Sequence, residues 1–197
     1  IGLARYGSNA ELVVANVAAM QRAVAEAGRM TPAAILAIHA ALMHDQPSAE
    51  PGAFRSEPVW IGGSGAYPHG AQFIPPHHER IQGGIQDLCA FIDRTDLPLI
   101  AHIAIAHAQF ETIHPFLDGN GRIGRLLIAA LLEQWGLLPE PLVYLSGYLK
   151  QHQAEYYRRL SAVRTEGDWE GWAGFFLDGV ETAAMDAERG IVAMASL

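Results

Sequence analysis

The chain has 197 residues, 50% of them hydrophobic and 17% charged, with 13 basic and 21 acidic side chains. This length suits one buried core and no shift in composition divides the chain, so we expect a single domain over residues 1–197. The net charge of -8 argues against broad contact with nucleic acid or an anionic membrane, and the apolar runs are shorter than the ~20 residues that cross a bilayer. The lone Cys89 excludes an internal disulfide and fits a reducing compartment, so we expect a cytoplasmic protein.

Periodic apolar residues predict a mostly helical fold. Residues 1–9 lack an initiator Met and the order of a signal peptide, so we interpret the start as trimmed. A first helix is expected over 9–28, and Thr31 followed by Pro32 marks the start of a second. Apolar positions three or four residues apart predict further helices within 81–92, 100–110, 123–135, 149–162 and 169–184.

A stretch rich in glycine and proline, residues 47–76, interrupts the helical pattern. Two short candidate strands, 59–61 and 71–74, flank a Gly-rich turn within it. We therefore expect an all-α fold with one small β-hairpin inserted between helices.

The segment 114–125 reads His-Pro-Phe-Leu-Asp-Gly-Asn-Gly-Arg-Ile-Gly-Arg and joins two predicted helices. Gly119 and Gly121 let backbone N–H groups approach a ligand where a helix N-terminus presents its unpaired donors, which favours an anion such as phosphate. Arg122 and Arg125 are placed to project toward that anion from the first helical turn. Two arginines suit a polyphosphate better than a monophosphate.

Two further side chains of this segment suit chemistry on a phosphate. Asp118 offers an oxygen ligand for Mg²⁺ that is shared with the substrate's phosphates. His114 titrates near neutrality, so it can take a proton from an incoming hydroxyl. Each residue alone is common in ordinary loops, but their combination in one short segment favours a catalytic site.

The other histidines lack the spacing of a zinc site, and His107, on an apolar helix face, is a candidate to orient the loop.

The segment 114–125 fits the Fic motif, His-x-Phe-x-Asp/Glu-Gly-Asn-Gly-Arg-x-x-Arg, at every specified position, so the chain resembles the Fic domain family. The likeness extends to the predicted hairpin and to two later segments: Trp60-Ile61-Gly62-Gly63, Phe73-Ile74-Pro75-Pro76-His77-His78, Leu145-Ser146-Gly147-Tyr148 and Tyr156-Tyr157. It implies a Fic-type helical bundle with a hairpin flap beside the active site, and a domain core at about residues 11–184.

The resemblance also implies roles for single residues. Within the motif, His114 would be the general base and Asp118 the ligand of Mg²⁺ or Mn²⁺. The α and β phosphates would be held by Gly119, Asn120 and Gly121. The β and γ phosphates would be held by Arg122 and Arg125. In the flap, Ile61 and Gly62 would clamp an extended segment of the target protein by strand addition. Tyr156 and Tyr157 match a pair that lines the adenine pocket, although a Tyr-Tyr step on a helix is by default core.

The activity that this likeness implies is transfer of AMP from ATP to a Ser, Thr or Tyr hydroxyl of a target protein, including the chain itself. Three alternatives stay open: hydrolytic removal of AMP at the same site, transfer of phosphate or phosphocholine, and a non-catalytic module that binds a partner. The sequence also leaves open whether the chain is a monomer or a homodimer. The family's inhibitory motif, Ser/Thr-x-x-x-Glu-Gly/Asn, is not found, and we expect it upstream of Ile1 in the parent gene.

Overall fold

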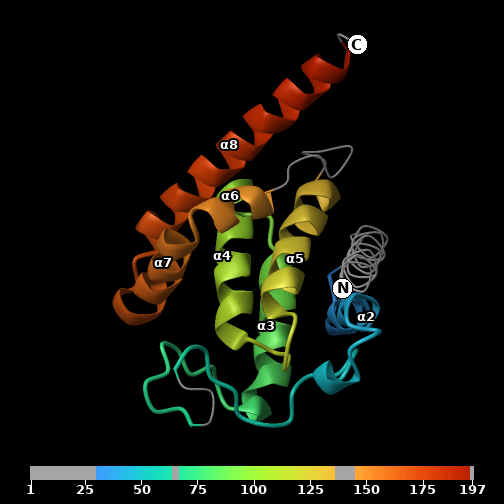
Figure 1. The fold of residues 1–197 in the computed structure, drawn as a ribbon, viewed down its shortest axis with the longest axis vertical. Coiled ribbons are helices and arrows are strands. Elements are labelled where there is room, and N and C mark those ends of the chain that lie inside the picture. The colour runs from blue at the N-terminus through green and yellow to red at the C-terminus, as the bar shows by residue number, and fades with distance from the viewer. Residues whose placement is uncertain (1–29, 64–66, 136–144, 196–197) are drawn as a thin grey trace, which may run out of the picture.

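The computed structural model describes residues 30–63, 67–135 and 145–195, and over this part of the chain the fold is all-helical (Figure 1). The helices are α2 (Pro32–Leu42), α3 (Ile81–Ile92), α4 (Leu99–Ile113), α5 (Asn120–Gln134), α6 (Leu145–Gln151), α7 (Gln153–Glu166) and α8 (Trp169–Ala195), with short 3₁₀ turns η1 (Pro47–Ala49) and η2 (His78–Arg80). The helix expected over 9–28 lies outside the described residues. None of the described helices is long and apolar enough to span a membrane.

Helix α4 lies at the centre of the bundle, where α3, α5, α7 and α8 pack against it (Figure 1). Its side chains Ile103 and Phe110 are fully buried, as are Trp172 and Phe176 of α8. The Trp172 indole also donates a 2.8 Å hydrogen bond to the Ala104 carbonyl of α4. Helix α4 is therefore held in place by packing on several sides. Its C-terminal end, at Ile113, leads directly into the predicted site.

Most helix starts follow the sequence signals. The Thr31 hydroxyl caps α2 by accepting a 3.1 Å hydrogen bond from the Ala34 amide, as predicted. The helix predicted over 149–162 is wrong in extent, because the structure has two helices, α6 and α7, that meet at His152. The backbone of His152 is non-helical, with φ -106 and ψ 32. Helix α8 also continues beyond the predicted end at 184.

The expected β-hairpin is not confirmed. The two candidate strands meet at one antiparallel bridge, in which the Ile61 amide donates to the Phe73 carbonyl at 2.9 Å and the Gln72 amide to the Ile61 carbonyl at 2.8 Å. Among the described residues no strand forms. Gly62 and Gly63 follow the bridge with φ of 79 and 83, a left-handed conformation that turns the chain away from an extended ladder.

Candidate active site

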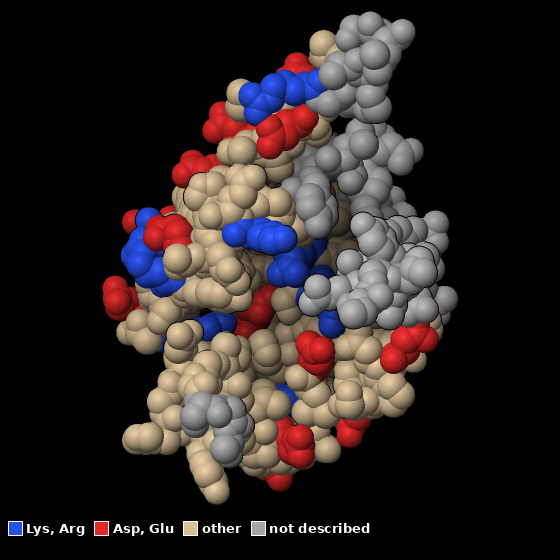
Figure 2. Space-filling model, viewed as in Figure 1, with Lys and Arg blue, Asp and Glu red and all other residues tan. Residues whose placement is uncertain are grey.

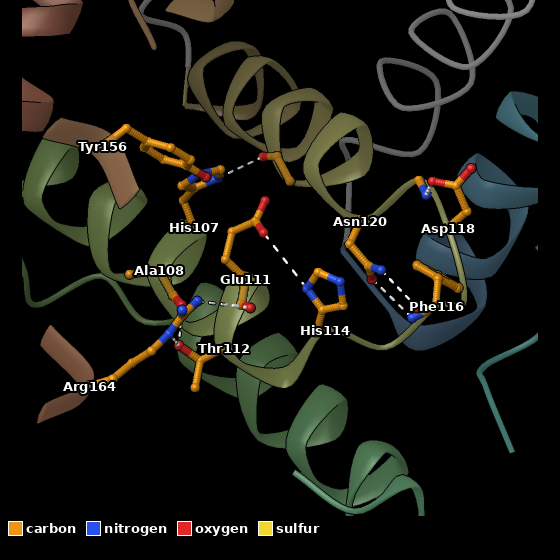
Figure 3. Close-up of polar contacts among 12 residues, drawn as sticks. His107, Ala108, Glu111, Thr112, His114, Phe116, Asp118, Asn120, Tyr156 and Arg164 are labelled. Carbon is orange, nitrogen blue, oxygen red and sulfur yellow. Dashed lines mark hydrogen bonds and ion pairs between the residues drawn. The ribbon is translucent and has the colours of Figure 1, made fainter. Parts of the chain in front are cut away.

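His114 ends α4 in a left-handed conformation that non-glycine residues rarely adopt, with φ 49 and ψ 62. Its amide donates to the Phe110 carbonyl at 2.9 Å, and its own carbonyl accepts a 2.9 Å hydrogen bond from Nε of Arg55. This conformation turns the chain out of the helix and aims the imidazole back toward α5 (Figure 3). The backbone of the predicted general base is thus held from both sides.

The Arg55 side chain is buried, with 3% exposure, and it was not singled out from the sequence. Besides His114, its guanidinium donates to the Glu57 carbonyl at 2.9 Å and the Pro76 carbonyl at 2.7 Å. The Arg55 amide donates to the Pro115 carbonyl at 2.9 Å. One guanidinium therefore joins the active loop to the middle and to the C-terminal end of the Gly/Pro-rich segment.

Asn120 closes the motif loop on itself. Its side-chain oxygen accepts from the Phe116 amide at 2.9 Å, and its nitrogen donates to the Phe116 carbonyl at 2.8 Å (Figure 3). Because the Asn120 side chain is buried and fully used here, only its backbone is left for a phosphate.

A second support of the loop is His39 of α2. Its ring stacks on Phe116 at a centroid distance of 3.7 Å, and its Nε2 lies 3.2 Å from the Asp118 carbonyl. The Gly52 amide donates to Nδ1 at 3.0 Å, so Nε2 carries the proton and donates to Asp118. Burial lowers the pKa of His39, which favours this neutral form.

The exposed side of the loop carries Asp118 and Arg122. The Asp118 side chain is 62% exposed, and its Oδ2 lies 3.5 Å from the Arg122 guanidinium. Gly119 has φ 84, and a Cβ there would lie 3.1 Å from Sδ of Met43. The described residues hold no cluster of three potential metal ligands. One accessible carboxylate still fits Mg²⁺, which binds through one or two carboxylates together with substrate phosphates and water.

Behind the loop, His107 joins three helices. Its Nδ1 lies 3.0 Å from the Gly124 carbonyl of α5, and its Nε2 lies 3.1 Å from the Tyr156 hydroxyl of α7 (Figure 3). Since a carbonyl only accepts, Nδ1 donates and Nε2 accepts from the hydroxyl. Burial lowers the pKa of His107 to about 4, which keeps the ring neutral. His107 therefore links α4 to α5 and α7, and its predicted role in orienting the loop stays a prediction.

The predicted base faces a buried acid that sequence reasoning did not single out. Nδ1 of His114 lies 4.0 Å from Oε2 of Glu111, one turn earlier on α4. Burial lowers the pKa of His114 to about 4, and the positive charges of Arg55 and Arg164 lower it further, while the Glu111 carbonyl and Asp118 oppose this shift. His114 is therefore neutral at pH 7, the state in which it can accept a proton.

Arg164 of α7 ties the site to the segment that follows the bridge. Its Nε donates to the Thr112 hydroxyl and its NH2 to the Glu111 carbonyl, both at 3.1 Å. Its guanidinium also lies 3.7 Å from the ring centroid of Phe73. This role of Arg164 could not be predicted, because Arg164 lies far along the chain from the motif.

The structure separates the tyrosine pair. Tyr156 is 6% exposed and bonded within the core, whereas Tyr157 is 52% exposed. Tyr157 lines a groove of about 330 Å³ together with Ile61, Leu160 and Arg164. The two tyrosines thus differ in exposure, although both line the hollow of about 270 Å³ beside Arg125, and the adenine role stays a prediction for the pair.

Arg125 lines a second hollow, of about 270 Å³, together with Tyr157 and Lys150, the only lysine of the sequence. Basic side chains gather around the hollowed centre of the face seen in Figure 2. Arg122 has different neighbours, Asp118 and Met43. The motif residues are thus brought to one end of α5, with a groove and a basic hollow beside them.

Gly124 is required by the close approach of α4 and α5. A Cβ at this position would lie 2.7 Å from Oε1 of Glu111 and 3.1 Å from Cε1 of His107. We expect Gly124→Ala to lower the free energy of unfolding by about 1–3 kcal/mol through overpacking. Gly83→Ala on α3 meets no atom within 4 Å, and we expect it to stabilise by about 0.5–1 kcal/mol. Urea unfolding measures both, and equal effects would contradict this role of Gly124.

The fold and the site define a class of protein: a helical domain in which a glycine-containing helix N-terminus follows a partly buried, neutral histidine. The family model described as Fic/DOC family matches residues 29–132, and the chain belongs to this family.

Known relatives agree with this assignment. The chain is 33% identical over 147 residues to a protein adenylyltransferase Fic from Aedes aegypti and 32% identical over 147 residues to one from Culex quinquefasciatus. These matches cover 75% of this chain but 27% of each relative, so the chain spans about a quarter of the length of these curated relatives. A Fic family protein from Desulfovibrio desulfuricans G20 has a crystal structure that matches 92% of this chain and 53% of its own, with 29% identity and a TM-score of 0.73.

Proposed function

We propose that the chain transfers AMP from ATP to the hydroxyl of a Ser, Thr or Tyr side chain in a target protein, which includes the chain itself. The observation that carries this proposal is the position of His114, a neutral and largely buried imidazole, directly before the helix N-terminus that begins at Asn120. Its relatives named protein adenylyltransferase support the same chemistry.

The nucleotide's phosphates fit at the start of α5. Backbone N–H groups of residues 119–121 and the positive end of the helix dipole suit the α and β phosphates. Arg122 and Arg125 supply guanidinium groups for the β and γ phosphates. Asp118 would hold Mg²⁺ or Mn²⁺, which when bound neutralises charge on the departing pyrophosphate.

The adenosine of ATP and the segment of the target protein then bind at different parts of the surface. The groove that Tyr157 shares with Ile61 and Arg164 has room for a base to stack on the exposed tyrosine ring. The amide and carbonyl of Ile61 are both used in the antiparallel bridge with residues 72 and 73, so an extended target segment would add its backbone hydrogen bonds beside the bridge, at Gly62. This placement brings a target hydroxyl to the mouth of the site.

The proton step follows from the burial of the imidazole. Because Nδ1 of His114 is buried, Nε2 is the nitrogen left to face the hydroxyl. As the hydroxyl oxygen attacks the α-phosphorus, its proton passes to Nε2 and the bond to pyrophosphate breaks in line. Hydrolytic removal of AMP would instead need an acid beside the attacking water. Glu111 lies on the Nδ1 side of the ring, and not at Nε2, where an attacking water would stand.

The test uses ATP labelled at the α-phosphate, with Mg²⁺ or with EDTA, and intact mass of the chain and of lysate proteins. We expect the mass of one AMP group on a protein, dependent on Mg²⁺ and strongly reduced in Arg125→Ala. Label transferred from the γ-phosphate instead would indicate phosphate transfer. Release of AMP from a modified protein, without attachment, would indicate the hydrolase, and no nucleotide binding by folded protein would indicate a binding module.

A further inference from the structure

The Glu111 carboxyl is a buried acid that the transfer reaction above does not use. Its side chain is 9% exposed, and its Oε2 lies 4.0 Å from Nδ1 of His114. Among the described residues, neither Oε1 of Glu111 nor Nδ1 of His114 has a hydrogen-bond partner. Figure 3 shows the carboxyl directed at the imidazole ring. A buried carboxyl whose Oε1 has no hydrogen-bond partner therefore lies beside an imidazole whose Nδ1 has none, with Oε2 as the nearer carboxyl oxygen, and buried polar atoms of this kind need an explanation.

The fold keeps space for this carboxyl. A Cβ on Gly124 would lie 2.7 Å from Oε1 of Glu111, and a Cβ on Gly121 would lie 3.8 Å from it. The Glu111 carbonyl is fixed by the 3.1 Å hydrogen bond from Arg164. The carboxyl thus sits where α4 meets the first turns of α5, against the helix that would carry the phosphates.

The charged and titratable groups around the pair come from five parts of the fold. They are His107 on α4, Arg125 on α5, Tyr156 and Arg164 on α7, Arg55 before the bridge, and Asp118 in the motif loop. Burial raises the pKa of Glu111 to about 7, although the positive charges of Arg125 and Arg164 and the Tyr156 hydroxyl oppose the shift. Burial lowers the pKa of His114 to about 4. The His114 imidazole alone is therefore a weak base. The Glu111 carboxyl has the higher pKa of the two and binds a proton more firmly.

We propose, on the basis of the transfer reaction, that Glu111 is the positioning residue of the general base and that its carboxylate accepts the Nδ1–H of His114 when the 4.0 Å between Oε2 and Nδ1 shortens to hydrogen-bond distance. This hydrogen bond fixes the tautomer whose Nε2 is free to accept a proton. When the target hydroxyl attacks, its O–H bond breaks and an Nε2–H bond forms. The resulting imidazolium is paired with the Glu111 carboxylate, and the proton passes to solvent after pyrophosphate leaves.

The variant Glu111→Gln keeps the size of the side chain and removes its charge. We expect kcat for AMP transfer to fall about 10- to 100-fold while KM for ATP changes less than about two-fold. The wild-type rate should rise as pH passes through 7, and this rise should be absent in Glu111→Gln.

Stability separates positioning from a merely structural role. The folded pKa of Glu111, about 7, is above the ordinary glutamate pKa of 4.5, so its ionisation weakens the folded state as pH rises between these values. Glutamine cannot ionise, and Glu111→Gln should have a higher Tm than wild type at pH 8 and no such gain at pH 4.5. A lower Tm at pH 8 together with lower activity would overturn the proposal in favour of a structural role.

A readout that needs no activity is NMR titration of the His114 ring, assigned by comparison with His114→Asn. The wild-type signals should move in two steps, near pH 7 as Glu111 ionises and near pH 4 as the ring protonates, and Glu111→Gln should lose the upper step. The control is Glu79→Gln, in an exposed pair where Glu79 lies 3.5 Å from His77, which should change neither rate nor titration. An upper step that persists in Glu111→Gln overturns the inference. If wild type transfers no AMP, the proposed function fails, and this titration still decides the Glu111–His114 contact.

Discussion

The variant His114→Asn should lower the rate of AMP transfer by about 10²–10⁴-fold, the usual contribution of a general base. Asparagine is preferable to alanine here because His114 has φ 49, and asparagine tolerates this left-handed conformation. The backbone that leads into the motif loop is then kept while the proton acceptor is removed. Single-turnover transfer of α-labelled AMP measures the effect, and calorimetry should show ATP binding within a few-fold of wild type.

The matched control is His44→Asn. The His44 side chain is 54% exposed and pairs with Asp45 at 2.8 Å. We expect wild-type transfer from this variant. Transfer by His114→Asn at the wild-type rate would remove His114 as the base, and loss of ATP binding in the same variant would assign it a role in holding the nucleotide.

The helical framework could be predicted because its signals are local. The Thr31-Pro32 start of α2 and the apolar spacing in α3 and α4 depend only on neighbours in the sequence, and the structure has these helices. The break at His152 could not be predicted in the same way, since no proline or glycine marks it. The hairpin prediction depended on two short apolar runs, and only Ile61 and Phe73 of them pair.

The motif residues were found from the sequence because they are contiguous, whereas their supports are scattered. Arg55 and Arg164 reach the site from segments on either side of the motif, and most of their targets are backbone carbonyls, which leave no trace in side-chain patterns. Glu111 lies near His114 in the chain. A single acidic residue in a helix is usually exposed, so its role could not be inferred before its burial was known. Asn120 was assigned to phosphate, and only the structure shows that its side chain is used by the loop itself.

The variant Arg55→Lys should be the most destabilising conservative change at the site. The planar guanidinium donates to three carbonyls, those of His114, Glu57 and Pro76. A lysine ammonium is a compact group that cannot match this fork, so at least one buried carbonyl would lose its donor. Each unsatisfied buried group costs about 1–3 kcal/mol, and we expect a loss of about 2–5 kcal/mol in urea unfolding. Transfer should also slow, since the hydrogen bond to the His114 carbonyl helps to hold its left-handed backbone.

The control for this change is Arg189→Lys on α8, where the guanidinium is 71% exposed and pairs only with Asp186 among the described residues. An exposed pair of this kind contributes about 0–1 kcal/mol, so Arg189→Lys should leave stability nearly unchanged. If Arg55→Lys is as stable as this control, the prediction is wrong, because the carbonyls of His114, Glu57 and Pro76 then have other hydrogen-bond donors. If it is unstable but transfers at the wild-type rate, Arg55 holds the fold without setting the geometry of His114. Loss of both would mean that the segment carrying the bridge and the base are fixed by the same side chain, so that docking of a target and proton transfer share one support.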